Sequence, residues 1–258
     1  RITTMKNQLT KIVLALIVLA SSSLALADHH AAPRTAALEA FFCSFEKGKD
    51  MDDLLKVTAE WDKWIDTSDS KGYEAYVMQP VINTGADFPY DYFWLGIAKN
   101  HEAMGQSSDE WMKKGGKIAA KFDAVAPCDT HILMTSQVVK PSNNNVKGGF
   151  AQISSCELNE GANMGSLMAA DKQWVSWMTD NEMPGALVRW FGGVGEAKDS
   201  TTDFYSVYLA ESLAQRGKAH DMMMAGGGAA LSSIYDDVMT CDVPRVYHGT
   251  PVGGKSAS

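Results

Sequence analysis

Two pairs of tryptophans constrain the fold of this chain more than any other feature. The two indoles of each pair are three residues apart, Trp61 with Trp64 and Trp174 with Trp177, and the second pair follows the first by 113 residues. Only 7 tryptophans occur in 258 residues, so the recurrence of such a pair indicates an internal repeat. A repeat has to be recognised before other fold arguments, because it decides the architecture.

Other residues match at the same offset or at an offset of 112. The matches include rare cysteines and turn-forming glycines: Cys43 and Cys156, Gly48 and Gly161, Leu54 and Leu167, Gly72 and Gly185, Gly105 and Gly217, Gly115-Gly116 and Gly227-Gly228, and Cys128 and Cys241. Their common order along the chain predicts a tandem duplication, in which each copy needs its own tryptophan pair.

Each copy has the same predicted elements. In the first, residues 40–46 alternate as a half-buried strand, and 51–66 carry apolar residues at helical spacing. Strands follow over 73–82 and 91–98, then a helix over 107–125 and a strand over 131–139. Ser107 or Ser108 is expected to cap the second helix. The second copy repeats the pattern over 150–158, 164–180, 185–193, 203–210, 220–238 and 244–250.

The order strand, helix, strand, strand, helix, strand is that of the ferredoxin-like fold. With its duplication and paired helix tryptophans, the chain resembles the dimeric α/β-barrel superfamily. It is also similar to secreted bacterial proteins of the same build. The resemblance implies an α+β protein in which two tandem ferredoxin-like βαββαβ repeats form a pseudo-dimeric α/β barrel. The alternative is two separate ferredoxin-like domains on a linker.

The predicted boundaries follow from the repeat. The first repeat covers 37–139, a polar linker 140–149, the second repeat 150–251 and a disordered tail 252–258. Before them, 1–27 form a leader and signal peptide with Met5 as the start, and 28–36 form a flexible N-terminal segment. Lys6 and Lys11, the apolar run 12–20 and the small-residue end at Ala27 are typical of such a signal. A membrane anchor is the alternative, although the run is shorter than the roughly 20 residues of a span.

Charge and export limit the partners. The formal net charge of the whole chain is −8, and it becomes −11 once the three basic residues of 1–27 are removed. Such acidity disfavours nucleic acid and, after signal cleavage, an anionic membrane surface. We therefore expect a periplasmic or secreted protein that is monomeric, because it already contains its own pseudo-dimer. A small-molecule ligand is the partner that remains.

The four cysteines allow three pairings. Cys43 and Cys128 are 85 residues apart, and so are Cys156 and Cys241. Equal separation favours one disulfide in each copy, where the first and last strands of a ferredoxin-like sheet are neighbours. Cross-copy disulfides and four free thiols are the alternatives. No two cysteines have the spacing of a zinc site.

Sequence motifs for catalysis are weak. Residues 225–229 (AGGGA) lack the Lys-Ser/Thr of a phosphate loop, and 192–195 (GGVG) lack the rest of a dinucleotide fingerprint. Ser68 and Lys71 match S-x-x-K without its companion motifs, and no G-x-S-x-G occurs. Whether the protein is an enzyme therefore stays open.

Residues that occur in one copy only are the candidates for ligand binding. They are aromatic, histidine or arginine residues: Trp94, His101, Trp111, His131, Arg189 and Trp190. A structural role is the simpler interpretation of each. Relatives in the superfamily place pockets between sheet and helices, and some bind haem or oxidise aromatic substrates. The resemblance implies haem as a candidate cofactor, but no matching Asn-Trp-His set can be placed here.

A copper site is a second cofactor hypothesis. Cleavage after Ala27 would expose Asp28, His29 and His30, whose terminal amine, backbone nitrogens and imidazole suit square-planar Cu(II). A polar tail without metal is the alternative, and no other cofactor is evident.

Three functions remain open. The first is an exported protein that binds a small, partly apolar ligand within the barrel. The second is a haem-related or cofactor-independent oxygenase or isomerase, and the third is a structural or interaction module.

Overall fold

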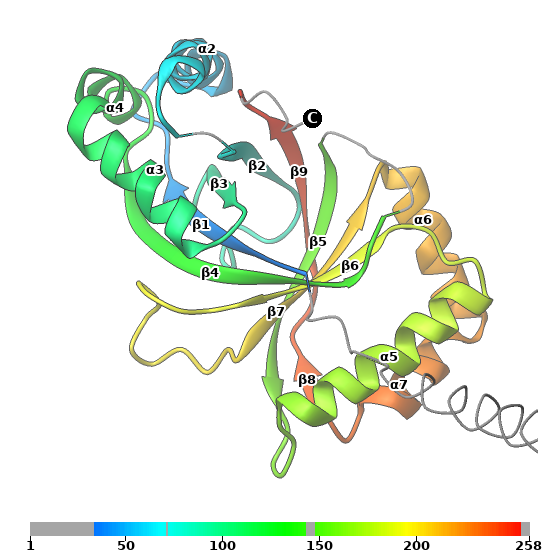
Figure 1. The fold of residues 1–258 in the computed structure, drawn as a ribbon. Coiled ribbons are helices and arrows are strands. Elements are labelled where there is room, and N and C mark those ends of the chain that lie inside the picture. The colour runs from blue at the N-terminus through cyan, green and yellow to red at the C-terminus, as the bar shows by residue number, and fades with distance from the viewer. Residues whose placement is uncertain (1–33, 71, 143–147, 254–258) are drawn as a thin grey trace, which may run out of the picture. The chain divides into compact units, whose positions relative to one another are not determined.

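The structure is a computed structural model that describes residues 34–70, 72–142 and 148–253. The first half, residues 34–142, contains four strands and three helices: β1 (Thr35–Cys43), α2 (Met51–Thr67), β2 (Glu74–Ile82), β3 (Tyr92–Ala98), α3 (His101–Lys114), α4 (Gly116–Asp123) and β4 (Cys128–Lys140). Helices α2, α3 and α4 lie together on the outer side of these strands (Figure 1).

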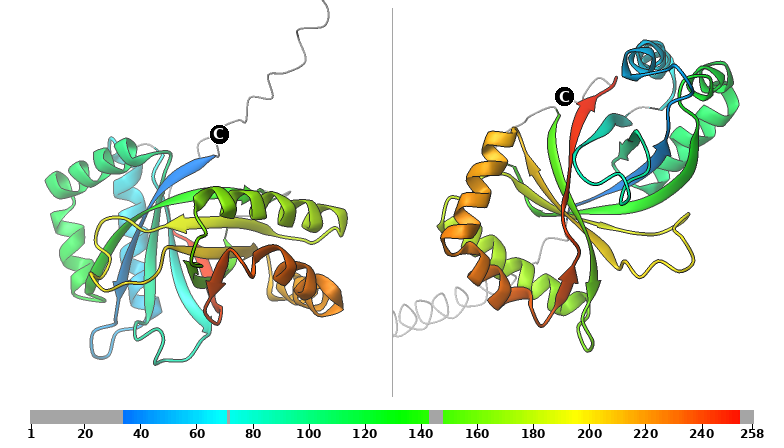
Figure 2. Two further views of the ribbon diagram at one scale, coloured as in Figure 1. Left: turned by 90° about the horizontal axis from the view of Figure 1, so that it is seen from below. Right: turned by 180° about the vertical axis from the view of Figure 1, so that it is seen from behind.

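The second half, residues 148–253, has the same order of elements with two additions. It contains β5 (Gly149–Leu158), α5 (Met164–Asp180), β6 (Ala186–Phe191), β7 (Phe204–Ala210), α6 (Leu213–Met222), the π-helical turn η1 (Met223–Gly227), α7 (Gly228–Tyr235), β8 (Met239–Cys241) and β9 (Arg245–Pro251). The short strand β8 and the turn η1 are the additions. Helices α5, α6 and α7 cover the outside of this half, as the views in Figure 2 show.

Eight antiparallel strands close into a barrel. Around it the order is β1-β3-β2-β9-β5-β7-β6-β4, and β4 pairs with β1 to complete the circle. β8 adds to the outer part of β5. The halves join reciprocally, because β4 of the first pairs with β6 of the second, while β9 of the second pairs with β2 of the first. The protein is therefore a mixed α+β barrel, and neither half has a free sheet edge of its own at these joints.

Most residues of β1, β3 and β6 are buried on both faces, which explains the apolar runs of these strands. On β1, Leu38 and Ala40 point into the barrel interior, while Ala37 and Cys43 point outward to the helices. The molecule therefore has one apolar core inside the barrel and one under each helix layer.

One helix start differs from the sequence prediction. α3 begins at His101, and Asn100 caps it by accepting a hydrogen bond from the Ala103 amide. The prediction of Ser107 or Ser108 as the cap was wrong, because Asn is as strong a cap as Ser and Asn100 lies about two helical turns earlier. Ser107 is buried mid-helix, and Gly115 separates α3 from α4.

The predicted disulfides are confirmed. Cys43 joins Cys128 between β1 and β4, and Cys156 joins Cys241 between β5 and β8. Each pair lies directly opposite in the strand register, which brings the Cα atoms to 4.0 Å. Two disulfides are typical of a protein that folds in an oxidising compartment. Within the described ranges, no helix has the length and apolar character needed to span a membrane.

Candidate functional site

The barrel interior contains two cavities. The first, which we call the aromatic cavity, has a volume of about 230 Å³ and is lined by Ala40, Phe42, Asp87, Phe88, Phe93, Ile132, Met134, Ile153, Ser155, Trp190, Tyr205, Asp242, Arg245 and Tyr247. The second, the glycine cavity, has a volume of about 250 Å³ and includes Leu38, Ile97, Gly149, Gly185, Trp190 and Gly249 in its lining. They lie toward opposite ends of the strands, since β1 gives Ala40 and Phe42 to one and Ala36 and Leu38 to the other.

An aromatic cluster closes one side of the aromatic cavity. Phe88 comes from the loop between β2 and β3, and its ring contacts those of Phe42, Phe93 and Tyr247 at centroid distances of 6.0, 6.1 and 5.2 Å. These tilted and edge-to-face contacts are the favourable geometries for aromatic rings. Phe88 is 8% exposed although its loop is otherwise polar. Phe88 therefore helps to hold the loop against the barrel mouth, together with Tyr90, whose ring lies 5.4 Å from that of Phe42.

The two halves give the aromatic cavity different walls. Phe42 pairs with Phe93 in the first half, and at the same place in the second half Ser155 pairs with Tyr205. Two positions on the last strand of each half follow the same rule. In the first half, Ile132 pairs with Ala40 and Met134 pairs with Leu38. At the equivalent places in the second half, Arg245 pairs with Ile153 and Tyr247 pairs with Ala151. The first half thus provides an apolar wall and the second half a wall with hydroxyl and guanidinium groups.

Several polar groups of the second wall lack a protein partner among the described residues. Among the described residues, neither Tyr205 nor Tyr247 places its hydroxyl in a hydrogen bond, and the buried Nε of Arg245 has no partner. Burial raises the pKa of Tyr247 to about 12, and burial together with the charges of Glu196 and Asp242 raises the pKa of Tyr205. Both phenols are therefore neutral donors at ordinary pH.

Charged groups form the rim of this cavity. Arg245 Nη1 donates to Asp242 Oδ2 at 2.6 Å, and Nη2 lies 3.6 Å from Asp87 Oδ2. The hydrogen bond to Asp242 is the main cause of the raised pKa of Arg245. Because Asp87 belongs to the loop that carries Phe88, this ion pair also ties the loop to β9.

Glu196 is a further titratable group near this end. Its carboxylate packs over Gly192, where a Cβ would clash with it. Its Oε1 is buried and has no hydrogen-bond partner in the described part of the chain, and burial raises the pKa of this carboxyl. Glu196 lines neither cavity, but its charge contributes to the raised pKa of Tyr205 in the wall of the aromatic cavity. A carboxyl with a perturbed pKa is a candidate acid or base.

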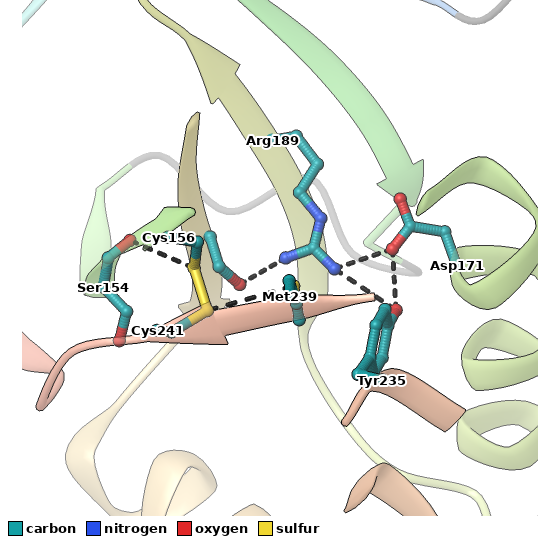
Figure 3. Close-up of polar contacts among 8 residues, drawn as sticks. Ser154, Cys156, Asp171, Arg189, Tyr235, Met239 and Cys241 are labelled. Carbon is teal, nitrogen blue, oxygen red and sulfur yellow. Dashed lines mark hydrogen bonds and ion pairs between the residues drawn. A yellow bond between two sulfur atoms is a disulfide. The ribbon is translucent and has the colours of Figure 1, made fainter. Parts of the chain in front are cut away.

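Trp190 is the sequence candidate that lines a cavity. It projects inward from β6, is 6% exposed, and borders both cavities. Its neighbour Arg189 points to the opposite face, into the helix layer of the second half. Figure 3 shows Arg189 with Asp171 and Tyr235: its Nη2 donates to Asp171 Oδ1 at 2.6 Å, and the Tyr235 hydroxyl donates to the same oxygen at 2.6 Å.

The Arg189 network is fully enclosed. Arg189 is 1% exposed, also donates to Ser206, and lies 5.4 Å from the ring of Phe204. Burial strongly raises the pKa of Tyr235. In the second half, Arg189 pairs with Ser206, and at the equivalent place in the first half Val77 pairs with Trp94. Val77 therefore takes the place of Arg189 in the first half. The network is therefore a structural ion pair without access to either cavity.

Trp94 and His131 are linked in the helix layer of the first half. Trp94 Nε1 donates to the Tyr73 hydroxyl at 3.0 Å, and that hydroxyl donates to Glu39 Oε1 at 2.5 Å. His131 Nε2 lies 3.0 Å from Glu39 Oε2, and its ring stacks on Phe41 at 3.7 Å. Burial and the charge of Glu39 raise the pKa of Tyr73 well above its usual value. This chain of groups runs from the half-exposed imidazole into the core.

The other candidates lie apart from the cavities. His101 Nε2 is 2.8 Å from Thr135 Oγ1, and Trp111 packs edge-to-face on Trp64 at 5.1 Å. Asp28, His29 and His30 fall outside the described residues. Sequence reasoning missed the residues that line the polar wall and rim, and also Glu39, Tyr73, Phe88 and Glu196. An apolar residue in a polar loop, as at Phe88, was the one signal available.

Comparison with known proteins identifies the fold. No protein-family model matches the chain, and no curated protein sequence does. Solved structures do match. An anthrone oxidase-like protein is 12% identical, with 87% of this chain and 97% of that one covered and a TM-score of 0.52. A proposed monooxygenase from Lactobacillus acidophilus is 8% identical over 84% and 94% of the two chains, with a TM-score of 0.52.

A proposed chlorite dismutase is 6% identical over 85% of this chain and 96% of that one, with a TM-score of 0.51. These neighbours place the chain in the dimeric α/β-barrel class of folds, as the sequence resemblance predicted. Because identities are so low, the likeness defines the fold and leaves the function to the site.

Proposed function

We propose that the protein binds a small, partly apolar molecule in the aromatic cavity of its barrel. The observation that carries this proposal is the contrast between the two walls. Phe42, Phe93 and Met134 face the space from the first half, while Ser155, Tyr205 and Tyr247 bring hydroxyl groups to it from the second. An apolar cavity with a few convergent polar groups is the usual form of a ligand site.

The cavity volume limits the ligand to a compact molecule. At about 230 Å³ the cavity lies just below the roughly 300–1,000 Å³ of drug-sized sites. A two-ring aromatic with one hydroxyl, such as 1-naphthol, matches both walls, since its rings would contact the phenylalanines and its hydroxyl would reach Tyr247 or Tyr205. We use 1-naphthol as the probe of the site.

Two matched isoleucines test the location. Ile153 lines the aromatic cavity and Ile97 lines the glycine cavity, and both are half-buried. Isothermal titration should show that Ile153→Trp, which fills the aromatic cavity, abolishes binding of 1-naphthol, while Ile97→Trp retains it. Equal binding by both variants, or no binding by the unmodified protein, would refute the proposal.

A second candidate is an oxygenase or isomerase without a metal cofactor. Glu196 favours it, because a carboxyl that packs over Gly192, and whose charge contributes to the raised pKa of Tyr205, could act as a base toward a bound phenol or ketone. The oxidase-like and monooxygenase names of two fold neighbours point the same way. Oxygen uptake with 1-naphthol that disappears in Glu196→Gln would establish this activity, and binding without uptake would exclude it for this probe.

Haem does not fit the cavities. Haem iron in proteins is held by axial ligands such as His, Cys, Met or Tyr in a pocket large enough for the macrocycle. Met134, Tyr205 and Tyr247 of the aromatic cavity are of residue types that can hold haem iron, but neither cavity has a His or Cys in its lining, and each is smaller than a typical site for a drug-sized ligand. The described residues also contain no cluster of three His, Cys, Asp or Glu side chains that could hold a metal. We therefore derive no haem chemistry.

The architecture supports a duplication and an exported monomer. The strand order is β4-β1-β3-β2 in the first half, and in the second β9 and β8 pair with β5, followed by β7 and β6. We propose that two ferredoxin-like repeats arose by tandem duplication, and that reciprocal pairing within one chain replaces a dimer. Analytical ultracentrifugation should give a monomer mass, and protein recovered from the periplasm or medium should begin at Asp28.

A further inference from the structure

Trp190 is the point at which the two barrel cavities meet. Of the described residues, it alone lines both of them. Ile153 and Tyr205 mark the aromatic side, and Val188, two residues earlier on the same strand, marks the glycine side. The indole therefore forms the wall between two spaces of similar volume.

The position of this wall is fixed from outside the barrel. β6 is paired on both sides, with Trp190 opposite Ser136 of β4 and opposite Tyr205 of β7. Its neighbour Arg189 is held on the outer face by Asp171 and Tyr235. A one-residue slip of a strand would exchange its inner and outer side chains. The buried ion pair therefore holds Trp190 on the inner face.

We propose that Trp190 is a specificity-determining residue that restricts the aromatic cavity to compact ligands and excludes extended chains. This inference rests on the proposed binding function and deepens it. An extended ligand that enters at the aromatic end meets the indole of Trp190 before it reaches the glycine cavity. Replacement of Trp190 by a small residue would join the two cavities into one channel through the barrel.

Two alcohols with the same number of carbons test the proposal. 1-Naphthol and 1-decanol both have ten carbons and one hydroxyl, but one is compact and the other extended. Native mass spectrometry and isothermal titration should show the unmodified protein binding 1-naphthol at least about tenfold more tightly. Trp190→Ala should gain at least about tenfold for 1-decanol, because burial of about two more methylene groups is sufficient for that factor.

Two further variants make the result decisive. Trp190→Leu keeps more of the core volume and should show the same change of preference if Trp190→Ala does not fold. Trp64→Ala removes a half-buried tryptophan from the helix layer of the first half and should leave both affinities unchanged. This control separates an effect at the wall between the cavities from a general loosening of the protein core.

The possible outcomes are distinct. Tight binding of 1-decanol by the unmodified protein, or folded Trp190 variants whose affinity for 1-decanol does not change, would overturn the inference while leaving ligand binding in place. Failure of the unmodified protein and of every variant to bind either alcohol would instead remove the proposed function, and the inference with it.

Discussion

The Arg189 network gives the sharpest stability prediction. Arg189 and Asp171 are both nearly inaccessible to solvent, at 1% and 6% exposure, and are joined by a 2.6 Å hydrogen bond. Removal of one partner of a buried ion pair typically costs about 3–5 kcal/mol, because the other charge is left without compensation. We therefore expect Arg189→Met to lower the free energy of unfolding by about 3–5 kcal/mol.

Replacement of the other partner, Asp171, should lower the free energy of unfolding slightly less. In Asp171→Leu the guanidinium keeps Ser206 and Tyr235 as partners and lies 5.4 and 5.6 Å from two aromatic rings. A desolvated cation over an aromatic ring gains up to about 2 kcal/mol. We expect the free energy of unfolding to fall by about 3 kcal/mol, at the lower end of the range for a broken buried pair.

The double variant removes both charges of the buried ion pair at once. An apolar replacement of a buried pair is often neutral or stabilising by about 1–4 kcal/mol, and the first half already has Val77 at the place of Arg189. Arg189→Met/Asp171→Leu should therefore be at least as stable as the unmodified protein to within about 1 kcal/mol. Its coupling energy should far exceed the roughly 0.5 kcal/mol seen between independent sites.

Urea unfolding followed by circular dichroism measures all three variants under non-reducing conditions. Arg216→Met is a matched control, since Arg216 Nε has the neutral partner Gln152 and is only half-buried. Loss of one such hydrogen bond should cost about 0.5–1.5 kcal/mol. A loss below about 1 kcal/mol in Arg189→Met, or additive losses in the double variant, would show that the ion pair is not what holds β6.

Three further predictions concern other contacts. Cys43→Ser/Cys128→Ser opens a loop of 85 residues and should lower the free energy of unfolding by up to about 4–5 kcal/mol in chemical denaturation. Tyr73→Phe leaves Glu39 without its buried donor and should cost about 1–3 kcal/mol, seen as a lower urea midpoint. Burial raises the pKa of Glu196 in the folded state above its ordinary value of 4.5. The contribution of this carboxyl to the free energy of unfolding is therefore complete below pH 4.5 and is lost as pH rises through the folded-state pKa. Thermal melts from pH 4 upward should therefore show the unmodified protein losing stability relative to Glu196→Gln, and parallel curves would contradict this assignment.

The sequence was informative where one physical signal was sufficient. Helix α5 was predicted over 164–180 and runs from Met164 to Asp180, because its apolar spacing and flanking polar residues all agree. The disulfide pairing was predicted from the equal sequence separation, 85 residues, of the cysteines in each copy. The strand β8 was missed, since three residues are too short to show alternation.

The candidate site could not be predicted in the same way. Arg189 and Trp190 are adjacent and were both proposed as ligand residues, yet one faces the helices and the other the cavities. Both faces of β6 are buried, so alternation of polar and apolar residues cannot show which face is inside. Glu39 was overlooked for a related reason. A carboxylate in a strand is normally solvated, and only the distant Tyr73 and His131 account for its burial.

The location of polar groups in the two halves favours the barrel, and not a helix layer, for the proposed ligand site. In both helix layers the main buried polar groups bond one another, as Glu39 does with Tyr73 and Asp171 does with Arg189, although the Nε of Arg189 has no partner among the described residues. Groups that satisfy each other hold the fold together and have little to offer a ligand. The aromatic cavity differs, because Tyr205 and Tyr247 present neutral hydroxyls to it with no protein partner among the described residues. Hydroxyls that border a cavity without a protein partner are available to a ligand, and this availability favours the barrel for the proposed binding.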